Sequence, residues 1–360
     1  MSNPNILSYI EKQVPWDRKD IYLDIYHLTQ IQGKKVAFHG SCTDGTITAA
    51  LLKHIKDGDV FIPLNYDILK DSTLRHYLAN LDWHAICDLE PFNKKQIDLY
   101  VDHHRSVIGQ PINAKRIYFE SGELGPSAAW VLYQSIKENY SIPKEIVELV
   151  EVSRVTDTAS FKIDPPIEHI QANHQIPRYN NNFDQYCWFI QDATFFDNDY
   201  TIKANIELVD AFASDLKTVL TNKSTIDRVN TRRNQRKLAY DFAASISIVP
   251  LMVIINSPNK TFQQTLALIL GQNGAKIICF LNEKEDLVTV SLRQSKKNTK
   301  AEIENYRLDL LAKKINSNGG GHAEAAGSAI PDLNSGILII REWANEKKLN
   351  MKLVDLTSSV

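Results

Sequence analysis

Three consecutive side chains of the kind that bind metals, Asp102, His103 and His104, directly follow the apolar run 99–101. A carboxylate and two imidazoles at the end of a strand are costly to bury without partners, and they are well suited to holding a divalent cation. One such triplet is common by chance on a protein surface. The triplet therefore indicates a metal site only if the rest of the chain supplies further ligands.

Two other apolar runs, 36–38 and 85–87, also end in side chains that can bind metals. The candidates in these two places are His39, Cys42, Asp44 and Asp88. If the three runs are parallel strands of one sheet, their carboxyl ends meet at the same edge, which is where ligands bind in such sheets. The side chains that follow the strands would then converge without any special loop.

A fourth carboxylate, Asp157, ends a helical stretch that begins near Pro143. Imidazoles and carboxylates together suit manganese, iron or zinc, with magnesium open if oxygen ligands dominate. A carboxylate can bridge two ions about 3.5–4 Å apart, and such a pair can activate water and stabilise charge on a phosphoryl group. We therefore expect a divalent-metal site with one or two ions, with manganese as the first choice.

The elements that must position these residues alternate between short β-rich runs and helical stretches from residue 34 to 160. This alternation predicts a parallel α/β sheet. The predicted strands are 35–38, 60–64, 85–87, 99–101 and 116–119. The predicted helices include 46–56, 72–81 and 126–137.

Residues 201–249 contain neither Gly nor Pro, and apolar residues recur there at helical spacing. We predict a long helical linker with a break near residues 222–224. Its later part carries basic residues that would form either a solvated helix face or a contact with nucleic acid. These residues are Arg228, Arg232, Arg233, Arg236 and Lys237.

A second, smaller α/β pattern follows the predicted linker. Its predicted strands are 246–256, 276–281 and 287–292, and its predicted helices are 263–270 and 307–316. We therefore expect an α/β fold in which a parallel-sheet domain is joined by a helical linker to a second, smaller α/β domain. The expected parts are a first domain 1–205, a linker 206–245, a second domain 246–345 and a C-terminal tail 346–360.

The composition narrows the class of protein further. A hydrophobic content of 43% and a charged content of 23% are ordinary for a soluble globular protein, and the net charge of -2 creates no global field for a polyanion. The cysteines lack CxxC spacing, which argues against structural zinc and disulfides. With no signal-peptide pattern and no apolar run of about 18 residues, we expect a cytoplasmic protein without a membrane partner. The sequence leaves open whether the protein forms a homodimer.

The order of these motifs resembles the DHH phosphoesterase superfamily, which includes RecJ-type exonucleases, nanoRNases, cyclic-dinucleotide phosphodiesterases, exopolyphosphatases and family II inorganic pyrophosphatases. The first four matching segments resemble motifs of its catalytic domain, and the last three resemble its DHH-associated substrate domain, which implies that the first expected domain is catalytic and that the second binds substrate. The segments are 39–45, Asp88, Asp102-His103-His104, Thr156-Asp157-Thr158, Ser291-Leu292-Arg293, Gly319-Gly320-Gly321-His322 and Ala325-Ala326-Gly327.

This resemblance implies a metal role for five residues. His39 and Asp88 would hold a first metal. A second metal would be held by Asp44, Asp88, His103 and Asp157, with Asp88 as the bridge between the two ions.

The resemblance also implies roles beyond the metals. Asp102 would support the site from behind the ligands, and His104 would face the substrate phosphate. The far end of the substrate would be held by Arg293 and by a loop whose glycines let backbone N–H groups approach an anion. The residues of that loop are Gly319, Gly320, Gly321 and His322.

Two positions depart from the family pattern. Cys42 stands where the family usually has a second aspartate, two residues before Asp44. It either fills space beside the site, ligates a softer metal such as zinc or iron, or leaves the first metal position weak or empty. A nucleophilic Cys42 would leave the carboxylates of the site unexplained. Asn318 stands where some members have a fourth glycine, which weakens the inference about the substrate.

The implied activity is that of a metal-dependent phosphodiesterase or exonuclease that hydrolyses short single-stranded oligonucleotides with metal-activated water. The near-neutral charge and the lack of further binding modules favour short substrates over long DNA. The alternatives are a small-nucleotide phosphatase, a cyclic-dinucleotide phosphodiesterase and an enzyme acting on polyphosphate. An alternative of another class is a catalytically silent nucleic-acid-binding DHH protein, which the unusual Cys42 supports.

Overall fold

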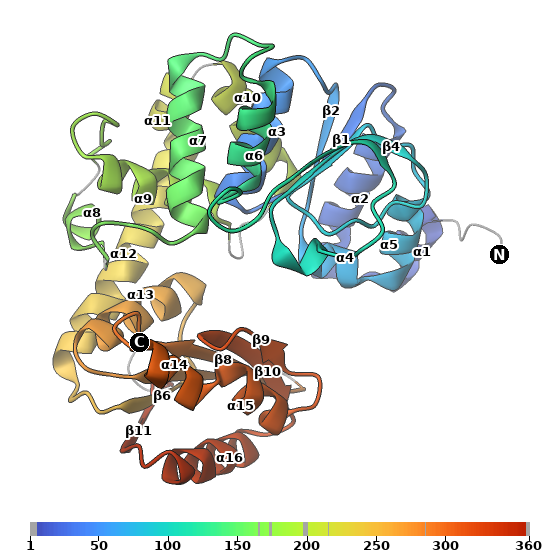
Figure 1. The fold of residues 1–360 in the computed structure, drawn as a ribbon. Helices are drawn as coiled ribbons and strands as arrows, with labels where there is room; N and C mark the ends of the chain where they lie inside the picture. The colour runs from blue at the N-terminus through green and yellow to red at the C-terminus, as the bar shows by residue number, and fades with distance from the viewer. Residues whose placement is uncertain are drawn as a thin grey trace. The chain divides into compact units, whose positions relative to one another are not determined.

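The computed structural model describes residues 6–164, 166–172, 175–196, 201–214, 216–284 and 286–357. The chain divides into two compact units (Figure 1). The first unit comprises Met1–Ile163 and Ala172–Asn230, and the second comprises Asp164–Gln171 and Thr231–Val360. In the described parts of the chain, every helix is too short or too polar to cross a membrane.

The first unit is built on a five-stranded sheet with the order β2-β1-β3-β4-β5, in which every neighbouring pair is parallel. This confirms the predicted parallel α/β sheet. Because β1, β3 and β4 are direct neighbours, the three motifs that follow them come to the same edge of the sheet. The strands are β1 (Lys35–His39), β2 (Val60–Leu64), β3 (Ala85–Cys87), β4 (Ile97–Asp102) and β5 (Ala114–Phe119).

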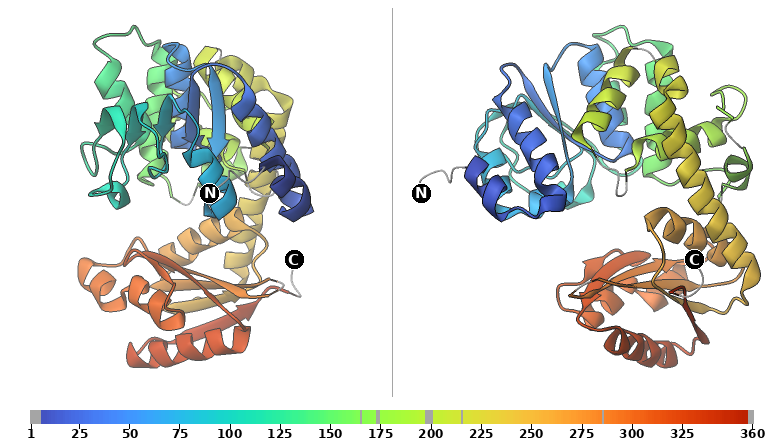
Figure 2. Two further views of the ribbon diagram at one scale, coloured as in Figure 1. Left: turned by 90° about the vertical axis from the view of Figure 1, so that its right-hand side faces the viewer. Right: turned by 180° about the vertical axis from the view of Figure 1, so that it is seen from behind.

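Helices cover both faces of this sheet (Figure 2). Successive side chains of a strand point to opposite faces, so Phe38 enters one apolar core while Ala37 enters the other. One face is covered by α3 (Thr43–His54), α6 (Ala128–Ile136), α7 (Lys144–Asp157), α9 (Phe183–Thr194) and α10 (Ile202–Ser214). The other face is covered by α1 (Ile6–Gln13), α2 (Trp16–Gln30), α4 (Tyr66–Lys70) and α5 (Ser72–Ala79).

The predicted linker is helical, with the expected break: α11 (Leu216–Thr221) ends just before Asn222, and α12 (Lys223–Ser245) begins just after it. Helix α10 packs into the core of the first unit through Leu208, Val209 and Phe212. The division between the two units falls within α12, after Asn230.

Three of the five basic residues predicted to form a solvated face or a nucleic-acid contact on α12 correct the sequence analysis, while Lys237 is exposed as on a solvated face. Arg232, Arg233 and Arg236 are only 3%, 4% and 2% exposed, so they form neither a solvated face nor a surface for nucleic acid. Arg232 donates a hydrogen bond to the hydroxyl of Thr261, and Arg236 donates one of 3.0 Å to Thr265. The charges are buried because the helix that carries these threonines, α13 (Lys260–Gln272), packs against α12 in a second-unit core.

The second unit has a six-stranded mixed sheet with the order β11-β6-β7-β8-β10-β9. Its strands are β6 (Leu251–Ile255), β7 (Ile277–Glu283), β8 (Val288–Gln294), β9 (Gly320–Gly321), β10 (Ala325–Ile330) and β11 (Met351–Asp355). The remaining helices are α8 (Ile167–Gln171), α14 (Lys300–Tyr306), α15 (Leu308–Ile315) and α16 (Leu333–Glu346). The expected tail from residue 346 is therefore wrong in part, because β11 pairs in parallel with β6. As an edge strand with incompletely buried side chains, β11 has only a weak apolar pattern.

A buried histidine lies at the amino end of β3, opposite the edge that carries the metal-type residues. His84 is 8% exposed, and its Nε2 and Nδ1 lie 2.8 Å and 2.9 Å from carboxylate oxygens of Asp57 and Asp98. Both nitrogens donate only when the ring is doubly protonated. Burial opposes ionisation of Asp57, but the charge and hydrogen bond of His84 outweigh it and lower the pKa of that carboxyl.

We expect His84→Gln to lower the free energy of unfolding by about 2 kcal/mol at neutral pH, because charge-assisted hydrogen bonds are lost. Since the pKa of Asp57 is lowered by folding, its contribution is present above about pH 4 and disappears as the pH falls through the folded value. Urea unfolding across this pH range measures the effect. The exposed His76→Gln variant is the control, and an equal loss in both variants would contradict the prediction.

Candidate metal centre

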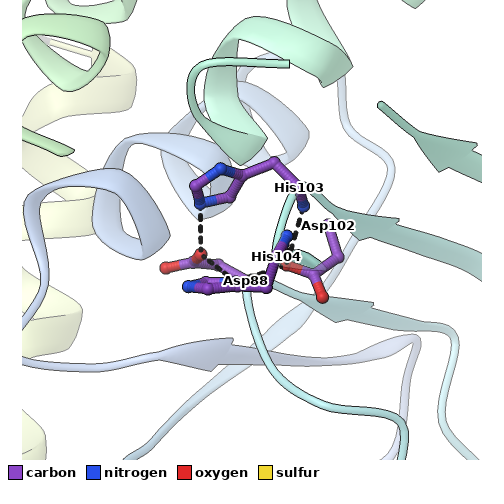
Figure 3. Close-up of side chains that lie close together, drawn as sticks. All are labelled: Asp88, Asp102, His103 and His104. Carbon is purple, nitrogen blue, oxygen red and sulfur yellow. Dashed lines mark hydrogen bonds and ion pairs between the residues drawn. The ribbon is translucent and has the colours of Figure 1, made fainter. Parts of the chain in front are cut away.

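The carboxyl edge of the first sheet brings the predicted metal ligands together. His39 ends β1, Asp88 follows β3, and His103 follows β4, while Asp44 lies in the first turn of α3 and Asp157 ends α7. Figure 3 shows His103 pointing toward the Asp88 carboxylate, with His104 lying between Asp88 and Asp102. The side chains that could hold a metal fall into overlapping groups whose ligand atoms lie within 4.8 Å of one another.

Three carboxylates surround one nitrogen of His103. Its Nε2 lies 3.3 Å from Asp157 Oδ2, 3.6 Å from Asp44 Oδ2 and 3.7 Å from Asp88 Oδ1. This nitrogen is buried and has no hydrogen-bond partner in the described part of the chain. Buried polar atoms normally form hydrogen bonds. A nitrogen that forms none and is surrounded by carboxylate oxygens is therefore well placed to bind a cation together with them.

Asp88 occupies the centre of the arrangement. It is 1% exposed, and neither carboxylate oxygen has a hydrogen-bond partner among the described residues. Its Oδ2 faces His39 Nδ1 at 3.3 Å while its Oδ1 faces His103. Burial opposes ionisation of Asp88, but the nearby histidines, His39 first, outweigh it and lower the pKa of its carboxyl. The φ of +56° lies in the left-handed region, where aspartate is tolerated better than most residues.

The Asp44 carboxylate lies at the amino end of another helix. Its oxygens accept hydrogen bonds of 2.6 Å and 2.9 Å from the backbone N–H groups of Ala128 and Ala129, at the start of α6. Burial and the charges of Asp88 and Asp157 nevertheless raise the pKa of Asp44 well above its ordinary value. The next residue, Gly45, lets α3 begin close to the end of β1, because a Cβ at this position would lie 2.2 Å from the carbonyl oxygen of His39.

Asp102 is fully buried, and both of its oxygens are occupied within the protein. Its Oδ1 accepts hydrogen bonds from the His103 backbone N–H at 2.8 Å and from His104 Nδ1 at 2.7 Å, while its Oδ2 lies 2.9 Å from the Tyr100 hydroxyl. Burial would lower the pKa of His104, but the hydrogen bond to Asp102 and nearby charges raise it to about 9. Asp102 is thus placed to orient His104.

The Asp157 side chain is 26% exposed, and its partial burial together with the charge of Asp88 raises its pKa to about 6. When folding raises the pKa of a carboxyl, the free energy of unfolding of the protein falls as the pH rises. The fall begins at about pH 4, the pKa in the unfolded chain, and continues through the pKa in the folded protein. We therefore expect metal-free Asp157→Asn protein to be more stable than the native chain at neutral pH. With manganese at about 100 times its dissociation constant, the native chain should gain about 2.7 kcal/mol and the variant much less.

Thermal unfolding with manganese or with a chelator measures both effects. Glu145→Gln, an exposed change in the first turn of the same helix, is the matched control and should leave the manganese gain unchanged. A variant less stable than the native chain without metal, or one with an equal gain from manganese, would contradict the prediction.

Cys42 lies beside His39 and Asp88 and could complete a ligand group with them. Burial and the charges of Asp88, Asp157 and Asp44 raise the pKa of its thiol well above the ordinary value. A metal-free Cys42 is therefore a neutral thiol, which argues against the nucleophilic alternative.

Two residues near the site were missing from the sequence analysis. Tyr66 meets the His39 ring edge-on, with centroids 5.0 Å apart, and burial with the charge of Asp88 raises the pKa of its hydroxyl. Its place just after β2, next to β1 in the sheet, is a signal that could have found it. Asn205, fully buried on α10, accepts a 3.0 Å hydrogen bond from the Ser41 backbone N–H. Nothing in the local sequence indicates this contact across 164 residues.

The second unit holds the predicted substrate residues close to one another. Arg293 on β8 pairs in register with Ala325 on β10, and Gly321 on β9 pairs with Ala326. The φ of Gly321 is +138°, and a Cβ there would lie 2.5 Å from the carbonyl oxygen of Ala325, so the hairpin requires glycine. Burial lowers the pKa of Arg293, and its guanidinium forms no ion pair within the described residues.

No family model and no curated protein matches this sequence. Solved structures do match. A pGpG-specific phosphodiesterase, PggH from Vibrio cholerae, is 16% identical with a TM-score of 0.62, and the match covers 88% of this chain and 99% of PggH. RecJ from Thermus thermophilus in complex with Mn²⁺ is 13% identical with a TM-score of 0.56, covering 98% of this chain and 58% of RecJ.

The DHH domain of a member of the S1p family of ribosomal proteins is 13% identical with a TM-score of 0.54, and the match covers 96% of this chain and 93% of that domain's chain. The chain therefore has the fold shared by these proteins, and the predicted DHH-type fold is confirmed.

Proposed function

We propose that this protein is a divalent-metal-dependent phosphoesterase that hydrolyses short single-stranded oligonucleotides. The observation that carries the proposal is the set of buried, unpaired atoms around Asp88, which are the Asp88 oxygens, His39 Nδ1 and His103 Nε2. Leaving such atoms unpaired is unfavourable, and a functional site is the usual reason that they persist.

The donor set fits divalent metals, because it combines carboxylate oxygens with imidazole nitrogens. Asp88 faces both histidines and would bridge two positions, one with His39 and one with Asp44, His103 and Asp157. When bound, the metal would activate water and offset negative charge on the phosphoryl group. Manganese remains our first choice for the position that has only oxygen and nitrogen donors.

His104 would bind the substrate phosphate. Its Nδ1 is held by Asp102, and its pKa of about 9 keeps the ring protonated at neutral pH. Nε2, for which the described residues supply no hydrogen-bond partner, can then donate to a phosphate oxygen and stabilise the charge that grows there. Asp102 acts through His104 as a positioning residue.

In the second unit, Arg293 and the loop 319–322 are the candidate contacts for an anionic group of the substrate. Arg293 is partly buried and has no carboxylate partner among the described residues, and such a guanidinium is suited to bind a phosphate or carboxylate of a ligand. The backbone N–H groups of Gly319 and His322 already donate to the carbonyls of Asn316 and Ala325, so the loop's own contribution would come from Gly320, Gly321 and the His322 side chain.

A dinucleotide is the second candidate substrate. The fold of this chain is similar to that of a phosphodiesterase specific for pGpG, which supports cleavage of very short substrates. Cyclic dinucleotides, nucleoside bisphosphates and polyphosphate remain further alternatives.

Hydrolysis of a substrate panel tests the proposal. The panel contains pGpG, RNA and DNA oligomers from dinucleotides upward, cyclic dinucleotides, bisphosphorylated adenosine and polyphosphate. Each would be incubated with manganese, magnesium, zinc or iron, and a chelator reaction is the control. We expect fastest turnover of the shortest single strands. Oligonucleotide binding without hydrolysis under any metal would instead support a catalytically silent protein.

A further inference from the structure

Cys42 lies where α3 begins. It is the N-cap residue of that helix, a position that favours side chains able to accept a hydrogen bond from the first turn. A thiol is a weak acceptor, and although the Gly45 backbone N–H lies near enough to act to lower the pKa of Cys42, the side chain forms no full capping bond. Its sulfur instead belongs to a group with one ligand atom each from His39 and Asp88, all within 4.8 Å of one another.

The two other members of this group have atoms without a hydrogen bond, although His39 Nδ1 and Asp88 Oδ2 face each other at 3.3 Å. Asp88 is 1% exposed, and both of its oxygens lack a hydrogen-bond partner in the described residues, so the Cys42 thiol does not satisfy them. His39 Nδ1 is buried and likewise lacks a hydrogen bond among those residues. A cysteine that only filled space would leave these atoms unexplained, whereas a cation bound by sulfur, nitrogen and oxygen would complete all three.

We propose that Cys42 is a ligand of the metal held by His39 and Asp88, so that the two metal positions of the chain differ in chemistry. The first has a sulfur donor, which selects zinc, cobalt or cadmium over manganese and magnesium. The second has only carboxylates and an imidazole, from Asp44, Asp157 and His103. The inference rests on the proposed metal centre and assigns one ligand within it.

Binding replaces one bond by another. The S–H bond of Cys42 breaks, a metal–sulfur bond forms, and the proton leaves to solvent. No electron is transferred, so neither an oxidant nor a reductant is required.

Ultraviolet and visible absorption tests this ligand directly, because a thiolate bound to Co²⁺ or Cd²⁺ gives a charge-transfer band that oxygen and nitrogen ligands do not. The full chain, stripped with a chelator, would be titrated with each metal. We expect the band in the native protein and its loss in Cys42→Ser, which retains a side chain suited to the N-cap. The affinity for Cd²⁺ should fall at least about tenfold, the lower end of the loss seen for residues that merely support ligands.

Two further variants sharpen the test. Cys279→Ala, in a buried strand of the second unit, should keep the band. Cys42→Asp should lose the band while it still binds Mn²⁺, because a carboxylate replaces the sulfur. A native protein that binds Co²⁺ or Cd²⁺ without the band, or a Cys42→Ser protein that keeps the band, would overturn the inference.

The outcomes for the inference and for the proposed function are distinguishable. Manganese-dependent hydrolysis without any charge-transfer band would refute the sulfur ligand and leave the phosphoesterase proposal standing. A charge-transfer band without hydrolysis of any substrate would support the sulfur ligand and count against the enzyme. A chain that binds none of these metals would refute both.

Discussion

Asp88→Asn should reduce manganese-dependent hydrolysis by at least about a thousandfold, which corresponds to about 4 kcal/mol of lost transition-state stabilisation. Among the residues that the structure describes, Asp88 is the one carboxylate that faces both His39 and His103. Asparagine removes its charge and presents an NH₂ group where one oxygen now faces a histidine nitrogen. Both metal positions should therefore weaken together.

Asparagine is the suitable replacement because the backbone at this position is strained for most residues. The φ of +56° is accepted by asparagine about as well as by aspartate, so the change leaves the loop after β3 intact. Metal-free variant and native protein should have similar circular dichroism, while calorimetric titration should show loss of manganese binding in the variant. The exposed Asp82→Asn variant is the matched control. Turnover within tenfold of the native rate would remove Asp88 from the site.

Asp102→Asn should lower the rate about a hundredfold or more at alkaline pH, through a different mechanism. The asparagine carbonyl can still accept the bonds that reach Oδ1, and its NH₂ group can donate to Tyr100, whose hydroxyl then donates to the Leu89 carbonyl 2.7 Å away. The geometry is thus kept and only the negative charge is lost. Without that charge the pKa of His104 should fall from about 9.

The rate of this variant should therefore depend on pH in a defined direction. Native His104 keeps its proton until the pH approaches about 9, whereas in the variant the proton leaves at lower pH, so the deficit grows as the pH rises. A bound cation offsets the contributions of Asp88 and Asp157 to this pKa, but the hydrogen bond to Asp102 remains. Steady-state rates across neutral and alkaline pH measure the effect. Tyr100→Phe, which keeps the Asp102 charge, is the control, and identical pH profiles for the native and Asp102→Asn proteins would contradict the role.

The agreement between sequence and structure is closest at the ends of β1, β3 and β4. Parallel strands that alternate with helices have their carboxyl ends at one edge, so residues placed just after three such strands must approach one another. The proximity of His39, Asp88 and His103 could therefore be predicted from the sequence. The DHH-like order of motifs added Asp157, whose helix supplies no comparable geometric rule.

The local sequence pattern did not predict burial or strand pairing where these depend on a segment far away in the chain. The arginines of α12 have the spacing of a solvated face, yet Arg232 and Arg236 are buried because α13 covers them with Thr261 and Thr265. Likewise, β11 becomes a strand only because β6 offers a parallel edge about 100 residues earlier. Sequence spacing does not specify which surface covers a helix or which edge accepts a strand.

By itself, the sequence determined the kinds of candidate ligand, their order and the sheet edge at which they meet, because these follow from residue type and from the period of strands and helices. The tertiary structure decided what each atom does. It placed the Asp44 oxygens on backbone N–H groups 84 and 85 residues away, occupied both oxygens of Asp102, and left those of Asp88 without a hydrogen bond among the described residues. These differences depend on hydrogen bonds and burial between distant segments, and they separate Asp88, whose oxygens make no hydrogen bond among the described residues, from Asp102, which holds His104.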